Sequence, residues 1–376
     1  MAKTVQEVMD FIRENNIQMV DFKMVDINGQ YRHVTIPAKN FSEKTMSNGI
    51  GFDASHYGYA VVEKSDMVFI PDPDTAVVDP FCEIPTLSMT GNAMIIDNPH
   101  NRPLPQYPRN IIRAAVQYMK DCGIADTMKI LPEFEFYLFD DVTWGISGDH
   151  ISASVDAKQS YWNSDVEGHG VIVPKQKNYH IAKPFDVSYE CRSEMCMRME
   201  EMGIEINYHH PEVAASGQFE IEPQLGEVVH MADATMMIKY IIHNTALKYG
   251  KSATFMPKPI YGEAGSGMHV HMLLMKDGQP VFSDDNGYSN LSETAHYFIG
   301  GLLKHIASLC ALTNPSTNSF KRLVPGFEAP VTVGYATSNR SAVIRIPAYA
   351  KAPPKICASQ RAKHPNATIK NEANFW

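Results

Sequence analysis

Cysteine and long hydrophobic runs are both scarce in this chain. Its 376 residues include six cysteines, at positions 82, 122, 191, 196, 310 and 357. Cys191 and Cys196 have no second pair at the spacing of a zinc site, so we interpret the cysteines as reduced thiols. No run of about 18 apolar residues occurs, so we expect no membrane span. The N-terminus lacks the apolar core of a signal peptide, which favours the cytoplasm.

Positive charge is not in excess either. Lys and Arg number 33 against 42 Asp and Glu, which gives a formal net charge of −9. A nucleic-acid backbone requires a basic surface, so nucleic acid is disfavoured as the main partner. ATP is not excluded, because a local arginine cluster or bound metal ions can offset the acidic balance.

The length favours two domains. Residues 4–16 predict an amphipathic helix with Thr4 as its N-cap, and residues 18–36 predict a β-hairpin around Asn28-Gly29. Short strand-like runs continue to about residue 96. The stretch 97–108 contains four prolines and is typical of a linker. We therefore expect a first domain at residues 1–105 and a second at 106–355.

The second part of the chain mixes helical and strand-like patterns. This mixture indicates an α+β domain. Helices are predicted at 109–122, 191–202, 230–249 and 291–312, and strands at 129–139 and 268–275.

Two glutamates alternate with phenylalanines in the run Leu131-Pro132-Glu133-Phe134-Glu135-Phe136-Tyr137. A strand has a period of two, so Glu133 and Glu135 share one face while the phenylalanines pack behind. A divalent cation between them would relieve the repulsion of two buried carboxylates. A half-exposed strand with solvated glutamates is the better explanation of this motif taken alone.

A second acidic pattern runs from His209-His210-Pro211-Glu212 to Gly217-Gln218-Phe219-Glu220-Ile221-Glu222. Gln218, Glu220 and Glu222 are predicted to lie on one face of a strand. A solvated sheet edge is again the alternative.

A third pattern, Gly265-Ser266-Gly267-Met268-His269-Val270-His271, places His269 and His271 on one strand face. A zinc site would usually need further His or Cys nearby. One imidazole with several carboxylates suits Mg²⁺ or Mn²⁺ instead. A pair of structural histidines explains this motif better when it stands alone.

A series of arginines follows. Arg322, Arg340 and Arg345 flank a Pro- and Gly-containing segment, 325–330, that carries Glu328. The segment predicts a loop that could close over a site, and the planar guanidinium groups could bind phosphate oxygens. Surface arginines are the alternative, which the apolar neighbours of Arg345 disfavour.

Taken together and in order, these motifs resemble the bacterial type I glutamine synthetases. The likeness runs from about residue 15 to residue 354. It includes Phe52-Asp53-Ala54-Ser55, Ser65-Asp66-Met67 and Phe255-Met256-Pro257-Lys258-Pro259 besides the acidic, histidine and arginine patterns above.

The resemblance implies a small N-terminal β-grasp domain and a catalytic domain built on an open antiparallel barrel with outer helices. It implies ATP-dependent ligation of ammonia to glutamate through a γ-glutamyl phosphate, with Mg²⁺ or Mn²⁺ as cofactor and ATP as co-substrate. It also implies a homo-oligomer, a dodecamer of two rings in the family, with active sites between subunits.

Roles carry over by position as the resemblance implies them. Glu135, Glu212 and Glu220 match ligands of the metal near glutamate and ammonium, and Glu133 and His269 match ligands of the metal at the ATP phosphates. Gly265 and Arg322 match glutamate contacts, and His271 and Arg345 match nucleotide-phosphate contacts. Arg340 matches the residue beside the transferred phosphoryl group, Glu328 the loop carboxylate that shields the intermediate, and Asp53 the ammonium-binding aspartate of a neighbouring subunit.

The sequence departs from the family pattern in four places. Ala264 stands where Asn is usual, and Asp53-Ala54-Ser55-His56 replaces the usual Asp-Gly-Ser-Ser. After Lys355 no Arg-x-Glu-x-Arg strand follows, and the family's remaining helices are absent. Residues 356–376 have little apolar periodicity, so we expect a non-family tail without regular structure.

Three functions remain open at this point. The first is glutamate–ammonia ligase. The second is a γ-glutamyl ligase that uses another amine. The third is a catalytically impaired family member, which the altered ending after Lys355 would favour.

Overall fold

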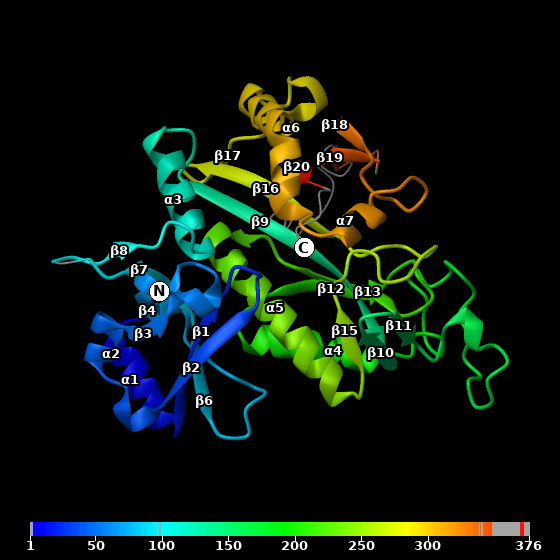
Figure 1. Ribbon diagram of the computed structural model, residues 1–376. Coiled ribbons are helices and arrows are strands. Elements are labelled where there is room, and N and C mark those ends of the chain that lie inside the picture. Colours follow the sequence, from blue (N-terminus) through cyan, green and yellow to red (C-terminus); the bar gives the residue numbers. More distant parts are fainter. Residues whose placement is uncertain (1–2, 98, 338, 340, 348–368, 372–376) are drawn as a thin grey trace. The chain divides into compact units, whose positions relative to one another are not determined.

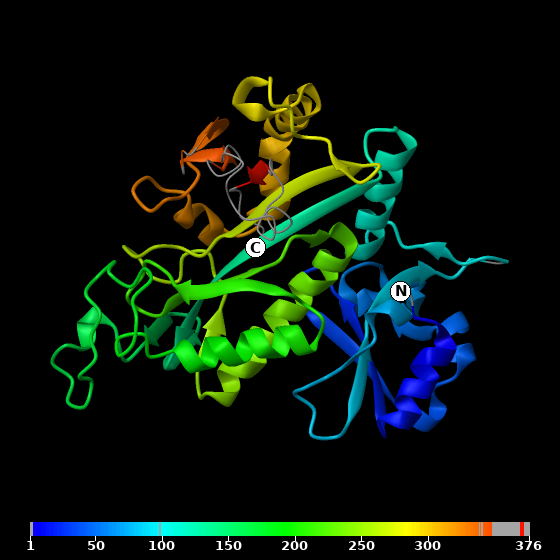
Figure 2. The ribbon, with the colours of Figure 1, turned by 180° about the vertical axis from the view of Figure 1, so that it is seen from behind.

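The computed structural model describes residues 3–97, 99–337, 339, 341–347 and 369–371. It divides into two compact units, and each is described here by itself. The first holds residues 1–121 with 232–237, and the second holds residues 122–231 with 238–376. Figures 1 and 2 show the ribbon from opposite sides. The expected boundary at residue 105 stays a prediction.

The first unit contains two four-stranded sheets, in the orders β2-β1-β6-β5 and β3-β4-β7-β8. In the first sheet β1 pairs antiparallel with β2 and parallel with β6, which is the mixed pairing expected of a β-grasp domain. The strands are β1 (Met19–Val25), β2 (Tyr31–Pro37), β3 (Ile50–Asp53), β4 (Asp66–Pro71), β5 (Val77–Val78), β6 (Thr86–Met89), β7 (Gly91–Ile95) and β8 (Arg102–Pro103). The helices are α1 (Val5–Glu14), α2 (Glu43–Asn48) and α3 (Pro108–Asp121).

Local sequence signals set the beginning of this unit. The Thr4 side chain accepts a bond from the Glu7 amide while the Glu7 carboxylate accepts one from the Thr4 amide, so α1 starts with a capping box. Val8 and Ile12 face the core one turn apart. Gly29 has φ +73° in the turn between β1 and β2, a conformation that L side chains rarely adopt. The predicted helix and hairpin are both confirmed.

The second unit is built on a ten-stranded sheet with the main order β12-β13-β9-β16-β20-β19-β18. The long strand β9 lies at its centre, and all pairings along this path are antiparallel except β18 with β19. A separate hairpin joins β10 and β11. The strands are β9 (Thr127–Phe139), β10 (Asp141–Ile146), β11 (Ile151–Asp156), β12 (Ile206–Pro211), β13 (Gln218–Pro223), β14 (Gly226–Glu227), β15 (Ser252–Thr254), β16 (Met268–Lys276), β17 (Gln279–Pro280), β18 (Thr332–Thr337), β19 (Ala342–Ile346) and β20 (Ile369–Asn371).

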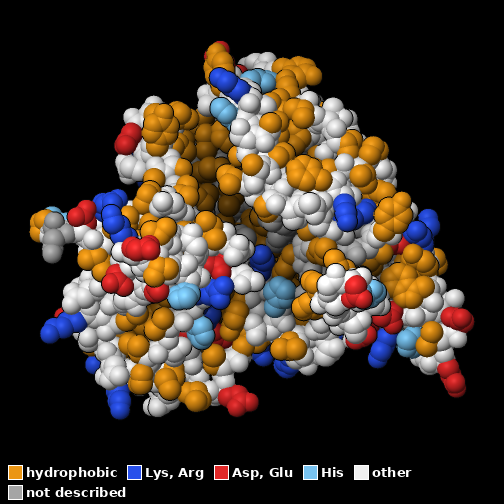
Figure 3. Space-filling model, viewed as in Figure 1, with side chains coloured by type: hydrophobic (Ala, Val, Ile, Leu, Met, Phe, Trp, Pro, Cys, Tyr) orange, Lys and Arg blue, Asp and Glu red, His pale blue; other side chains and the backbone are white. Residues whose placement is uncertain are grey.

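Four helices accompany this sheet, which completes the predicted α+β fold. They are α4 (Tyr189–Glu201), α5 (Val228–Lys248), α6 (Glu293–Thr313) and α7 (Thr317–Arg322). Within the described part of the chain, α6 is the one helix long and apolar enough to cross a membrane by length and composition. A single helix of this kind is weak support for a span, so the expected lack of one stays a prediction. Figure 3 shows hydrophobic side chains at the surface near the top of the view, where Figure 1 places α6.

The C-terminal segment differs from the expectation at three residues. Ile369–Asn371 form β20, which pairs antiparallel with β16 and with β19. The prediction that 356–376 lack regular structure is therefore wrong at these positions. The strand is decided by the open edges of β16 and β19, a tertiary feature that local periodicity does not report. The rest of that segment lies outside the described residues.

Candidate active site

Acidic and imidazole side chains stand in rows across the sheet of the second unit. His210 on β12 pairs with Glu220 on β13, and Glu220 pairs in turn with Glu135 on β9. In the adjacent row, Glu133 on β9 pairs with His269 on β16. Side chains two residues apart on a strand share a face, so both rows project from the same side of the sheet.

The opposite face of these strands is apolar and fully covered. Phe134 and Phe136 are 0% exposed, and Phe219 and Ile221 are 2% and 0% exposed. The alternation of the two strands therefore sends glutamate to one side and hydrophobic residues to the core. Neither set of glutamates lies at a solvated edge, because both strands are internal to the sheet.

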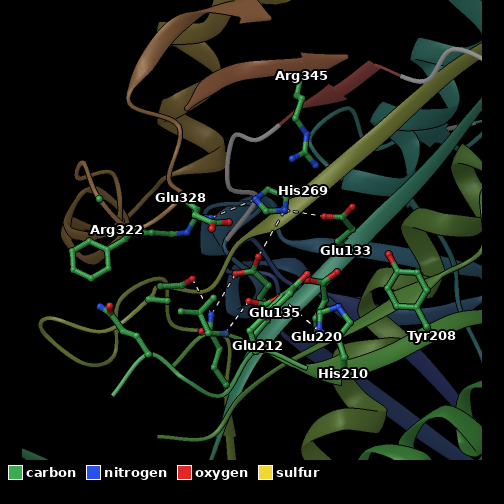
Figure 4. A pocket seen from close by; sticks show the side chains of 18 residues that line it. Glu133, Glu135, Tyr208, His210, Glu212, Glu220, His269, Arg322, Glu328 and Arg345 are labelled. Atoms are coloured by element: carbon green, nitrogen blue, oxygen red, sulfur yellow. Dashed lines mark hydrogen bonds and ion pairs between the residues drawn. The ribbon is translucent and has the colours of Figure 1, made fainter. Parts of the chain in front are cut away.

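A cavity of about 380 Å³ lies against this polar face (Figure 4). Nine of the twelve residues singled out from the sequence line it. They are Glu133, Glu135, Glu212, Glu220, Gly265, His269, Arg322, Glu328 and Arg345.

Four carboxylates of this cavity, those of Glu133, Glu135, Glu212 and Glu220, are largely removed from water, whereas Glu328 is exposed. Burial, the Glu135 charge and the Glu328 charge raise the pKa of Glu212 to about 8, against the opposing bond from the Val213 amide. Glu133, Glu135 and Glu220 are 6–8% exposed. Like charges held together away from water favour either a shared proton or a bound cation.

The donor set fits a hard divalent cation. Ligand atoms of His210, Glu212 and Glu220 all lie within 4.8 Å of one another, and those of Glu133, Glu220 and Glu222 do so too. Carboxylate oxygens with one imidazole suit Mg²⁺ or Mn²⁺ better than a softer metal. Ligand chemistry and spacing thus agree with the metal type expected from the sequence.

Two histidines bracket Glu133. His269 Nδ1 lies 2.9 Å from one carboxylate oxygen of Glu133, and His271 Nε2 lies 2.8 Å from the other. His271 is 5% exposed and does not line the cavity. It thus contacts and orients Glu133 without lining the cavity, and its expected phosphate contact stays a prediction.

The backbone at Gly265 approaches its neighbours closely. A Cβ atom there would lie 2.4 Å from the Pro257 carbonyl oxygen and 2.7 Å from Arg322 Cγ. The Gly265 carbonyl accepts a bond of 3.0 Å from Gln218 Nε2. Gly265 and Arg322 therefore form one packed wall of the cavity, which only a residue without a side chain permits.

Glu328 sits on the predicted loop in a sparsely populated conformation, with φ +55°. A non-glycine residue in that region carries some local strain. The adjacent Phe327 receives the Lys258 ammonium 3.8 Å from its ring centroid. The Lys258 amine also donates to the Glu263 carbonyl, so it ties this loop to the segment before Gly265.

Sequence reasoning missed several residues that line the cavity, among them Tyr179, Tyr208 and His210. His210 belongs to a motif that the sequence makes visible, and its distance from Glu212 (3.7 Å between Nδ1 and Oε1) gives it a role. Tyr179 carries no such signal, because it lies in an irregular segment and reaches the cavity only through the fold. Its ring stacks on His180 at 4.0 Å between centroids.

Asp53, like His271, is not among the residues that line this cavity. Asp53 lies in the first unit, where its carboxylate accepts bonds from the Ser55 hydroxyl (2.7 Å) and amide (2.9 Å). These bonds, with one from Ser65, lower the pKa of Asp53 to about 2, so it is anionic at neutral pH. Arg340 lies outside the described residues.

Comparisons with known proteins match both parts of the chain to the same family. The model of the glutamine synthetase catalytic domain matches residues 105–367, and the model of the glutamine synthetase β-grasp domain matches residues 16–95. A glutamine synthetase from Haemophilus influenzae is 44% identical over 352 residues, which cover 92% of this chain and 74% of that protein. A 3-hydroxylaminophenol mutase from Cupriavidus pinatubonensis shows the same identity and coverage. A cryo-EM structure of Plasmodium falciparum glutamine synthetase superimposes with a TM-score of 0.87 at 26% identity, over 99% of this chain and 72% of that one.

Proposed function

This chain belongs to the glutamine synthetase family of glutamate–ammonia ligases, and on that premise we propose that it joins ammonia to L-glutamate through a γ-glutamyl phosphate formed from ATP. The observation that carries the proposal is the single cavity in which Glu133, Glu135, Glu212, Glu220 and His269 meet Arg322 and Arg345. Phosphoryl transfer to a carboxylate needs this combination of anionic metal ligands and guanidinium groups.

Substrate glutamate is proposed to bind at the wall formed by Gly265 and Arg322. Arg322 is 3% exposed, and its guanidinium Nη2 lies 3.5 Å from His269 Nε2. A buried cation of fixed geometry can receive the α-carboxylate of an amino acid in a bidentate manner. The γ-carboxylate would then point toward the acidic rows.

The phosphate side of the cavity is proposed to lie at Arg345 and the Glu133–His269 row. Arg345 comes from β19 and lines the cavity, and in Figure 4 it lies above His269 and Glu133. When bound, Mg²⁺ or Mn²⁺ would neutralise phosphate oxygens and polarise the transferring group. Glu133, Glu135, Glu212, Glu220 and His269 are the residues that would hold it. Arg340 is proposed to assist beside the phosphoryl group.

Water must be kept from an acyl phosphate. The 325–330 loop carries Glu328 into the cavity, and Lys258 holds its Phe327 ring. We propose that this loop covers the intermediate and that Glu328 receives a proton from ammonium. Asp53, anionic at neutral pH, is proposed to bind ammonium in the active site of a neighbouring subunit. This assignment implies a homo-oligomer, and we propose separately that the chain acts in the cytoplasm.

The test is product formation by the purified chain with glutamate, ATP, Mg²⁺ and ammonium. Glutamine, ADP and phosphate in equal amounts are expected. A Glu328→Gln chain should lose glutamine formation, whereas Glu205→Gln, at an exposed position, should not. ATP turnover without a γ-glutamyl product, or none at all, would contradict the proposal.

A second function is favoured by one feature of the cavity. Ala264 lines it next to Gly265, at a position where Asn is usual in the family, and this departure favours a change in the amine that is accepted. A panel of primary amines in place of ammonium decides between the two. A preference for an amine over ammonium at equal free-base concentration would assign a γ-glutamyl–amine ligase. The mutase named among the relatives adds 3-hydroxylaminophenol as a substrate to include.

A further inference from the structure

Glu222 is a buried carboxylate for which the function proposed above has no use. It is 4% exposed and lies on β13 two residues beyond Glu220. On one side Glu222 pairs with Tyr208 of β12. On the other, β13 and β9 pair Gln218 with Tyr137 and Glu220 with Glu135, and one more step of two residues in this register sets Glu222 opposite Glu133.

Glu222 therefore extends the second row of the sheet. The row reads Tyr208, Glu222, Glu133, His269 across four consecutive strands. It runs beside the row of His210, Glu220 and Glu135 on the same face. Strands β12, β13 and β9 each contribute one polar residue to both rows, whereas β16 contributes only His269.

The orientation of the Glu222 carboxylate is fixed by neutral groups. Asn207 Nδ2 donates to Oε1 at 2.9 Å, and the Tyr208 hydroxyl donates to Oε2. Asn207 also donates to the Pro223 carbonyl at 3.0 Å, which holds its amide in place. These bonds select one rotamer without supplying positive charge, and each carboxylate oxygen retains a lone pair for a further partner.

A cation bound to the Glu222 carboxylate could also contact two other carboxylates. Ligand atoms of Glu133, Glu220 and Glu222 fall within 4.8 Å of one another, and all three residues are buried. Glu220 belongs also to the group with His210 and Glu212. We propose that Glu222 is a ligand of a divalent cation shared with Glu133 and Glu220, so that Glu220 connects two neighbouring cation positions.

This inference rests on the proposed function only in taking the cavity as a metal-dependent site. It adds a specific carboxylate that does not itself line the cavity but lies next to Glu133, on the side assigned to the phosphates. Asn207 and Tyr208 are then positioning residues, since they act on the metal through Glu222. A proton shared between Glu222 and Glu133 is the competing occupant, and the two make different predictions for metal affinity.

The experiment measures Mn²⁺ binding to the full chain after removal of metal by a chelator, with no substrate present. Isothermal titration and Mn²⁺ electron paramagnetic resonance give the number of sites and the affinity of each. Glu222→Gln keeps the shape and both neutral donors but removes the charge. It should weaken one class of site at least about tenfold and leave the other class within about twofold.

The matched control is Glu205→Gln, which removes the same charge from an exposed position just before β12 and should bind Mn²⁺ like the parent. Tyr208→Phe removes the hydroxyl donor and keeps the ring. It should weaken the same class of site by about tenfold, as loss of an orienting group does. If Glu222→Gln does not fold, Tyr208→Phe decides the question by itself.

The inference is overturned if Glu222→Gln and Tyr208→Phe bind Mn²⁺ with the stoichiometry and affinities of the parent chain, which would leave a shared proton as the occupant. Because no substrate is used, this outcome is independent of the ligase assay. If the parent chain makes no glutamine but Glu222→Gln loses one class of Mn²⁺ site, the proposed function is refuted and the assignment of Glu222 as a metal ligand stands.

Discussion

Replacing Gly265 by alanine offers the most direct test of how this cavity is built. The added Cβ would lie 2.4 Å from the Pro257 carbonyl oxygen, 2.7 Å from Arg322 Cγ and 3.2 Å from Arg322 Cδ. The first of these neighbours is backbone, and the second belongs to a side chain that is 3% exposed. Neither can yield freely, so the wall must move or Arg322 must turn away.

The expected cost follows from overpacking. Forcing an extra carbon into a close-packed site destabilises a protein by about 1–3 kcal/mol. For cooperative units of about 150–250 residues, each kcal/mol lowers the unfolding midpoint by about 2–4 °C. Displacing a substrate-binding group by about 1 Å can cost about 100-fold in rate. We therefore expect Gly265→Ala to lower the unfolding midpoint by several degrees and to reduce kcat/KM for glutamate by about 100-fold.

The assay pairs differential scanning calorimetry with steady-state kinetics at varied glutamate. Gly334→Ala is the matched control, because a Cβ at Gly334 on β18 would meet nothing within 4 Å. It should change neither quantity appreciably. If Gly265→Ala unfolds at the parent temperature and keeps the parent KM for glutamate, then the close approach of Gly265 to Arg322 does not constrain the site.

Three further predictions address other parts of the second unit. Arg192→Met should lower the free energy of unfolding by about 3–5 kcal/mol in urea titrations, because the two bonds from Arg192 to Asp186 (2.9 and 2.6 Å) are buried and the aspartate would lose its partner; a loss below about 1 kcal/mol would show that water replaces the guanidinium. Lys258→Met should loosen the loop that contains Phe327, so hydrogen exchange in that loop should rise while the rest of the unit keeps its protection; unchanged exchange would mean that the cation–π contact does not hold the loop. Burial raises the pKa of the Cys196 thiol to about 12, so the folded state favours the neutral thiol. The free energy of unfolding should be unaffected by this group below its unfolded pKa of about 9 and should fall as the pH rises from there toward 12. Alkylation of Cys196 at pH 8 should therefore be slow in the native chain and fast in urea, and equal rates would refute the shift.

Local signals in the sequence determined much of this fold. The capping box at Thr4 and the Asn28-Gly29 turn act between residues near in sequence, and the structure has both where they were predicted. The alternation at 131–137 likewise required a strand with glutamates on one face. These features depend on backbone geometry and on a period of two, which a single segment displays by itself.

The registers between strands were decided by the tertiary structure. Glu220 lies opposite Glu135, and Glu133 lies opposite His269, because β13 and β16 flank β9. The sequence places each of these residues on a strand face but does not say which strands are neighbours. Before the structure, only the resemblance to a known family, and no single sequence pattern, indicated that these residues belong to one site.

The same registers explain the roles that sequence reasoning could not assign. His271 lies on the same strand face as His269, yet it is buried against Glu133 and does not line the cavity. Glu222 looks like a solvated edge residue in the sequence, yet the pairing of β13 with both β12 and β9 buries it in a row of polar side chains. A one-residue slip of either strand would turn these side chains to the opposite face. The sequence by itself determined which strand positions carry carboxylate and imidazole side chains, whereas packing of the strands determined which of these side chains meet.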